Sequence, residues 1–145
     1  MTRADLLAFM RSETYAVQTS VSPDGVPQAA VVGIAVTDAF EIVFDTLETS
    51  RKARNLRGNP ALAFVIGGTH AGDERTVQYE GTADVPEGAE LERLQQVYFG
   101  KFPDGPDRQA WPGLIYVRVT PSWIRYSNYN AQPPEIIEFD PRDWT

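Results

Sequence analysis

The order of its elements constrains the fold of this chain more than any other feature of the sequence. After a short N-terminal helix, strand-like segments follow one another through tight turns, with one short helix among them and a longer helix late in the chain. Strands and helices do not alternate regularly, which argues against a parallel doubly wound sheet. The pattern instead predicts a mainly β fold with peripheral helices (α+β), in which a six-stranded antiparallel sheet forms a small barrel.

Apolar periodicity and turn residues set the boundaries of these elements. Three helices are predicted, over residues 2–11, 46–57 and 88–100, and the sequence Gly58-Asn59-Pro60 ends the second of them. Strands are predicted over residues 15–21, 26–36, 40–44, 61–66, 75–85 and 114–126, the last of them broken near Pro121. Residues 101–113 are predicted to form a loop, and residues 136–139 could add an edge strand.

The composition excludes several classes of protein. The 145 residues are the length of one domain, so we expect a single domain over residues 1–145. No apolar run approaches the roughly 20 residues of a transmembrane helix, and the N-terminus lacks the apolar core of a signal peptide, which predicts a cytoplasmic protein that does not bind membranes. Acidic residues outnumber basic ones by 20 to 13, which disfavours nucleic acid as a partner. The absence of cysteine and the single histidine predict no metal site and exclude thiolate catalysis.

One segment concentrates positive charge in this acidic chain. Four basic residues lie within seven positions: Arg51, Lys52, Arg54 and Arg57. If Ser50 caps the helix, Arg51 and Lys52 occupy its first turn, where each positive charge opposes the helix dipole by about 0.3–1 kcal/mol. A bound phosphate would reverse the sign, because free amides, a hydroxyl, a guanidinium and an ammonium together form a phosphate cradle. The alternative is a solvated basic helix whose serine does no more than cap it.

The same segment resembles the pyridoxamine 5'-phosphate oxidase-like family, which consists of FMN-binding split β-barrels. The family pattern is a strand that ends in an aromatic residue and Thr, then Ser-Arg-Lys at the start of a helix that ends near Asn-Pro. This sequence has Phe44, Thr46, Ser50-Arg51-Lys52 and Asn59-Pro60 at matching spacing. Residues 77–83 and 116–126 resemble later strands of the family, so the resemblance covers roughly residues 5–127.

The resemblance implies a homodimer with FMN in a groove between the subunits. By position, Ser50, Arg51 and Lys52 would hold the phosphate, and Asp45 and Thr46 would line the flavin edge. The strand that runs beside the isoalloxazine would include three further residues: Val31, Val32 and Gly33. Thr76 stands where the oxidases proper have a Gln that contacts the flavin.

Departures from the family pattern affect the substrate. The oxidases proper carry basic residues at the positions of Ala30 and Ala35, and a Trp and an Arg near those of Ser127 and Ile137. Their C-terminal segment with basic residues for the substrate phosphate is also missing. We therefore predict an FMN-dependent oxidoreductase that acts on a small-molecule substrate or electron donor other than pyridoxamine phosphate. No side chain is an evident acid or base, so no catalytic residue is predicted.

Two alternatives remain open at this point. The chain could be a non-enzymatic protein that binds flavin or haem, or a reductase that uses the deazaflavin F420, as related barrels do. His70, in a Gly-rich turn, is either a solvated side chain or an axial haem ligand. Late aromatic residues such as Trp111 and Trp123 would either cover the flavin from the partner subunit or belong to the core or the dimer interface.

Overall fold

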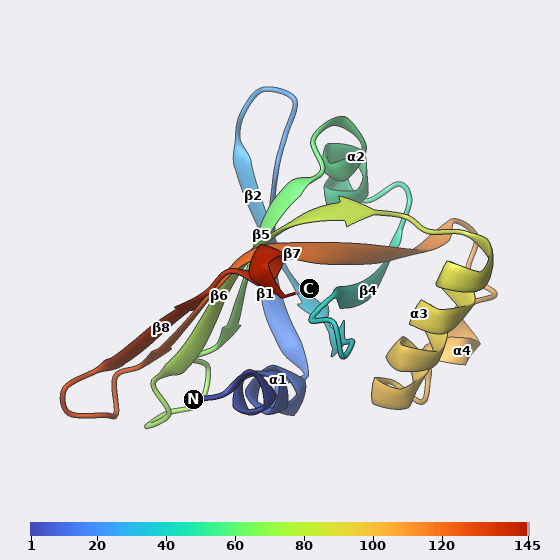
Figure 1. Ribbon diagram of the computed structural model, residues 1–145. Helices are drawn as coiled ribbons and strands as arrows, with labels where there is room; N and C mark the ends of the chain where they lie inside the picture. Colours follow the sequence, from blue (N-terminus) through green and yellow to red (C-terminus); the bar gives the residue numbers. More distant parts are fainter. Residues whose placement is uncertain (145) are drawn as a thin grey trace.

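The computed structural model describes residues 1–144 and contains one curled antiparallel sheet (Figure 1). Its strands are β1 (Tyr15–Val21), β2 (Pro27–Gly33), β3 (Ala35–Val36), β4 (Ile42–Leu47), β5 (Ala61–Gly67), β6 (Arg75–Asp84), β7 (Leu114–Asn128) and β8 (Glu135–Phe139). They lie in the order β2-β1-β5-β6-β7-β4-β3, and β8 pairs with β7. The predicted mainly β, antiparallel α+β architecture is confirmed. The sheet has more strands than the six expected, because the segment 26–36 divides at Ile34 and because β8 forms.

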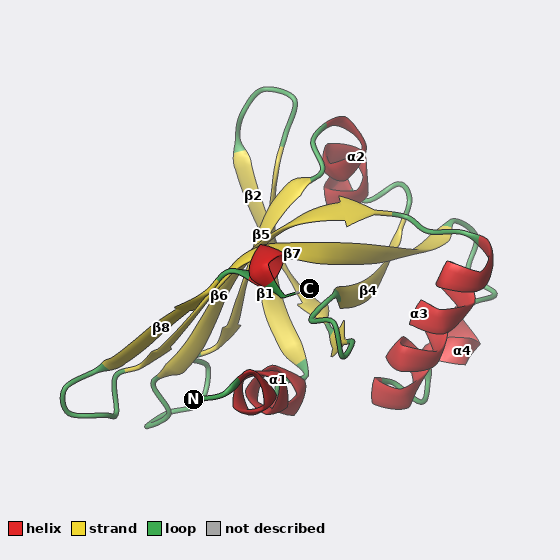
Figure 2. Ribbon diagram, viewed as in Figure 1, coloured by secondary structure: helices red, strands yellow, loops and turns green. Residues whose placement is uncertain are grey.

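The helices lie at the periphery of the sheet (Figure 2). They are α1 (Arg3–Ser12), α2 (Arg51–Gly58), α3 (Gly88–Lys101), α4 (Gly105–Arg108) and the 3₁₀ helix η1 (Pro141–Asp143). No helix within residues 1–144 combines the length and the apolar character that a membrane span requires. The prediction of a helix from residue 46 is wrong at its start. Thr46 and Leu47 pair with β7 as the end of β4, and the helix begins only after Ser50. The predicted loop 101–113 contains α4.

The predicted break near Pro121 is also wrong, because β7 continues through this residue. Pro121 pairs with Gly81 where the register between β6 and β7 shifts after Glu80. A proline is tolerated at such a bulge because its missing N–H is not needed there. Gly81 is required as well, since a Cβ atom on it would lie 2.5 Å from the carbonyl oxygen of Thr120.

The main core cluster fixes where α2 sits. Its largest fully buried side chains include Tyr79, Phe44 and Phe64, and Leu56 anchors α2 to the same cluster. A second, smaller cluster holds α3 against β3, β4 and β7. Because Leu56 and the buried Asn55 face the sheet, the first turn of α2 is placed beside β1 and β2.

Candidate functional site

The first turn of α2 forms the centre of the candidate site. Ser50 caps the helix, since its Oγ atom accepts a hydrogen bond from the Ala53 amide at 3.2 Å. The Thr46 hydroxyl lies 3.0 Å from the Ser50 hydroxyl, which joins the end of β4 to the cap. No acidic residue is present in this turn. The structure therefore brings Thr46, Ser50, Arg51 and Lys52 together, with two positive side chains at the positive end of the helix.

The positive charge of α2 is not neutralised by the protein. Most arginines elsewhere form ion pairs with carboxylates, as Arg75 does with Asp73 and Arg118 does with Asp84. Within residues 1–144 none of the four basic side chains of α2 forms such a pair, although acidic residues outnumber basic ones. This turn is accordingly a favourable place for an anion.

A hydrogen-bond network that begins at the buried Asn55 orients the Arg51 guanidinium. The Asn55 side-chain amide donates to the Ser20 hydroxyl at 3.1 Å and to the Gln28 side-chain oxygen at 2.9 Å. The same oxygen accepts from Arg51 Nε at 3.1 Å. Since only Nε is engaged, the terminal nitrogens of Arg51 have no partner within residues 1–144 and remain available for a ligand.

These groups line a cavity of about 250 Å³ between β1, β2 and α2. Its lining residues are Gln18, Ser20, Gln28, Ala29, Ala30, Arg51 and Lys52. Gln18, Gln28 and Asn55 were not predicted from the sequence as site residues. The alternation of β1 is a signal for Gln18 alone, because it places Gln18 and Ser20 on the same inward face as Ala16.

Asp45 and Gly33 belong to a second group of contacts, made by the segment after α3. Arg108 donates from Nε to Asp45 at 3.0 Å and from Nη2 to the Tyr98 hydroxyl at 3.1 Å. The Phe102 ring packs on Tyr98, and a Cβ atom on Gly33 would lie 2.8 Å from that ring. Burial raises the pKa of Tyr98, and the Asp45 carboxylate adds to the rise. The Asp45 side chain is thus held by Arg108, and Gly33 is needed for the close approach of Phe102.

The remaining predicted residues do not gather at α2. Val31 points to solvent with 66% of its surface exposed, whereas Val32 is buried in the core, as strand alternation requires. Thr76 pairs with Gly67 and Ser127 and contacts Gly68, at the end of β5 that is farther from α2.

The outward face of β1, β2 and β5 carries a second cavity, of about 570 Å³. Its wall includes the exposed apolar side chains of Tyr15, Val31 and Val65. His70 lies at this cavity, with Nε2 3.5 Å from an oxygen of the nearly buried Glu13. An apolar sheet face of this kind on a folded protein is typical of an interaction surface.

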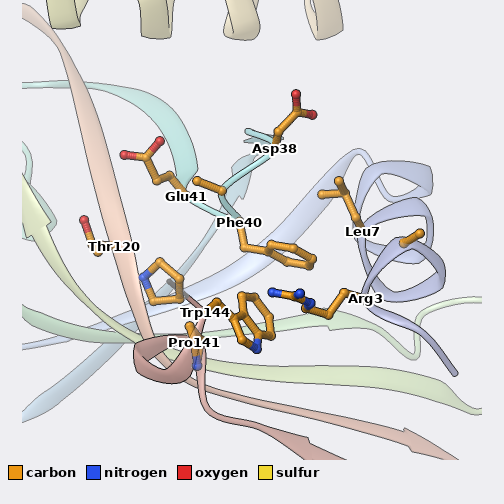
Figure 3. Close-up of a pocket in the computed structure, with 11 residues that line it drawn as sticks. Arg3, Leu7, Asp38, Phe40, Glu41, Thr120, Pro141 and Trp144 are labelled. Carbon is orange, nitrogen blue, oxygen red and sulfur yellow. The ribbon is translucent and has the colours of Figure 1, made fainter.

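A third cavity, of about 510 Å³, lies beside α1 and contains none of the predicted residues (Figure 3). Phe40 has a φ angle of 63°, and its ring packs 4.7 Å from the ring of Trp144. The carboxylate of Glu41 at the rim is already paired with Arg93 and Arg118. Asp38, which also lines the cavity, is paired with Arg11, so within residues 1–144 both of its carboxylates are paired.

Comparison with known proteins relates this site to a family. The sequence matches the model of the family named pyridoxamine 5'-phosphate oxidase over residues 2–128. It is 34% identical over 96 residues to the pyridoxine/pyridoxamine 5'-phosphate oxidase of Rubrobacter xylanophilus. The match covers 66% of this chain and 41% of that protein, so the chain spans less than half the length of this curated relative.

Solved structures share the fold at low sequence identity. A haem-binding protein from Mycobacterium smegmatis superposes with a TM-score of 0.83 at 16% identity, over 98% of this chain and 59% of that one. A pyridoxamine 5'-phosphate oxidase-related, FMN-binding protein from Nostoc punctiforme superposes with a TM-score of 0.73 at 14% identity, over 95% and 87% of the two chains. The curled sheet is therefore that of a split barrel.

Proposed function

Since the chain belongs to the pyridoxamine 5'-phosphate oxidase family, we propose that it binds FMN and is a flavin-dependent oxidoreductase. The observation that carries the proposal is the unneutralised first turn of α2, where Arg51 and Lys52 stand beside a hydroxyl cap with no carboxylate partner within residues 1–144. A phosphate monoester with two negative charges would compensate this turn. The FMN-binding structural relative from Nostoc punctiforme has the same fold, which agrees with this cofactor.

The chemistry of the donors at this turn fits the phosphate of FMN. Ser50 supplies a hydroxyl, Arg51 supplies two free terminal nitrogens, and Lys52 supplies an ammonium. Thr46 and Asp45 follow on β4 toward the position where the family places the flavin edge. Bound FMN would supply the redox chemistry, as a two-electron acceptor and donor. The protein itself would hold the phosphate, orient the ring and exclude water. The proposal assigns no side chain as an acid or base.

We further propose that two copies of the chain form the cofactor groove. The exposed apolar face of β1, β2 and β5, with Tyr15, Val31 and Val65, is the surface best suited to a second copy. A groove on one small barrel would leave much of a flavin ring in water, and a symmetric partner would cover it. The His70 cavity lies on the same face.

The substrate in this proposal is not pyridoxamine phosphate. Ala30 and Ala35 replace the basic residues of the oxidases proper, and Ala35 is buried in the second core cluster. No cation is therefore available at these two positions for the phosphate of that substrate.

The proposal is tested by the double variant Arg51→Ala/Lys52→Ala. We expect the purified protein to bind FMN, with an absorption band of bound flavin, and the double variant to lose several kcal/mol of binding free energy because charge-assisted contacts are removed. Isothermal titration and fluorescence quenching measure the loss. The matched control is Arg54→Ala, which changes a basic residue of α2 that is exposed and outside the cavity. Equal FMN affinity of the wild type and the double variant contradicts the phosphate assignment.

Haem is a second candidate ligand, favoured by two observations. His70 borders the apolar cavity of about 570 Å³ on the outward face, and the Mycobacterium smegmatis structural relative is a haem-binding protein. Substitution His70→Ala would then abolish the Soret shift on haem addition. Extraction and mass measurement of the cofactor that co-purifies distinguish FMN, the deazaflavin F420 and haem.

A further inference from the structure

We propose that Gln18 binds a hydroxyl group of the ligand next to its phosphate, so that the site selects phosphate esters of polyols. The inference rests on the proposed function, in which α2 holds the phosphate. In FMN the hydroxyl would belong to the ribityl chain. Gln18 has no position in the Ser-Arg-Lys motif, and its role comes from the geometry of β1.

The carboxamide of Gln18 is buried and incompletely hydrogen-bonded. The residue is 1% exposed, and its side-chain oxygen has no hydrogen-bond partner among residues 1–144. Its direct neighbours across the sheet are Ala30 on β2 and Phe64 on β5, and neither side chain can donate a hydrogen bond. A buried polar atom without a partner is rare and costly in a folded protein, which calls for an explanation at this position.

The position of Gln18 connects this atom to the ligand site. Gln18 lines the cavity of about 250 Å³ together with Arg51 and Lys52. The other uncharged acceptor oxygens there are already engaged, since Ser20 Oγ and Gln28 Oε1 accept from Asn55. Gln18 Oε1 is therefore the side-chain acceptor of the cavity wall that has no donor among residues 1–144 and is left for a ligand.

The chemistry of the Gln18 side-chain oxygen determines which group of the ligand it can bind. A carboxamide oxygen can only accept a hydrogen bond, and a phosphate dianion has no proton to donate. A hydroxyl on the carbon chain beside the phosphate does have one. The Gln18 carboxamide thus recognises the hydroxyl, while Arg51 and Lys52 hold the phosphate.

The test compares two ligands of equal charge, glycerol 1-phosphate and n-propyl phosphate. We expect the wild type to bind glycerol 1-phosphate about three- to tenfold more tightly, as one hydrogen bond allows, and Gln18→Leu to remove this preference. The shift in melting temperature with ligand concentration measures both affinities without FMN. Gln18→Met is the second variant, and Gln96→Leu, an exposed glutamine of α3, is the matched control.

Two further readouts separate this inference from a structural role. Inorganic phosphate should stabilise the wild type and Gln18→Leu equally. The unliganded variant should melt at a higher temperature than the wild type, because a buried atom without a partner has been removed. Lower stability of unliganded Gln18→Leu and Gln18→Met, loss of the phosphate effect, or an unchanged ligand preference overturns the inference. If FMN does not bind but the preference for glycerol 1-phosphate depends on Gln18, the proposed function fails and the inference stands.

Discussion

At the residue scale, Tyr79 connects two distant parts of the barrel through one buried hydroxyl. Its oxygen lies 2.9 Å from the carbonyl oxygens of both Phe40 and Val119. Burial raises the pKa of the phenol, and the charge of Glu41 adds to the rise. An unfolded tyrosine releases its proton near pH 10. The folded protein keeps the proton there, so this contribution to stability is complete below about pH 10 and is lost as the pH rises further.

We therefore predict that the free energy of unfolding falls above pH 10, and that Tyr79→Phe makes this fall shallower. At pH 8 the variant should be less stable by about 1–3 kcal/mol, since the two carbonyls that share this one buried O–H lose their donor. Urea denaturation at pH 8 and pH 11 measures both effects. Tyr129→Phe, at a tyrosine that is 51% exposed, is the control and should leave the stability at pH 8 unchanged. An identical pH dependence in wild type and Tyr79→Phe would show that other groups cause the decline.

At the element scale, the positive charges in the first turn of α2 favour the binding of an anion but destabilise the unliganded helix. We predict that Lys52→Glu stabilises the unliganded protein by about 0.3–1 kcal/mol at low ionic strength, because a negative charge replaces a positive one at the positive end of the helix dipole. The same variant should lose affinity for phosphate. Arg57→Glu, at the opposite end of the helix, should destabilise by a similar amount. Denaturation in low and high salt measures these changes. If both variants change the free energy of unfolding in the same direction, the helix dipole is not the cause.

Elements with local signals were predictable, and elements set by distant pairing were not. The bounds of β1 match the prediction, because a helix end and a Pro-Asp-Gly turn enclose it. The path of β7 through Pro121 depends on Gly81, which is distant in the sequence, so no local rule reveals it. The boundary between β4 and α2 was misplaced for the same reason, since pairing with β7 keeps Thr46 in the strand.

The candidate site divides in the same way. Ser50, Arg51 and Lys52 are neighbours in the sequence, and a capping rule places them on one helix turn. Gln18 reaches the same cavity only through the register of β1 with β2. Likewise the contact between Arg108 and Asp45 depends on how α4 packs against β4, which the pattern of the loop 101–113 does not reveal.

At the scale of the whole molecule, the two ligand-related features lie on opposite sides of the β1–β2 hairpin. Along these strands the side chains alternate between two faces. On one face Gln18 and Ala30 line the cavity beside α2, and on the other face Val31 belongs to the exposed apolar surface. The same short strands would thus bind the phosphate on one side and a second copy on the other. Dimer formation and cofactor affinity should therefore depend on each other.

This coupling is tested by Val31→Lys. We predict that the wild type is a dimer by light scattering, and that the variant is a monomer with lower FMN affinity, because a charge is placed in an apolar interface. The fold of the variant should persist, since Val31 is 66% exposed in a single chain and surface substitutions usually change stability by about 0.5 kcal/mol or less. Val85→Lys, a valine 50% exposed beside α2, is the matched control and should remain dimeric. If the wild type is a monomer, the proposed interface does not exist. If Val31→Lys remains a dimer, the interface lies on another surface.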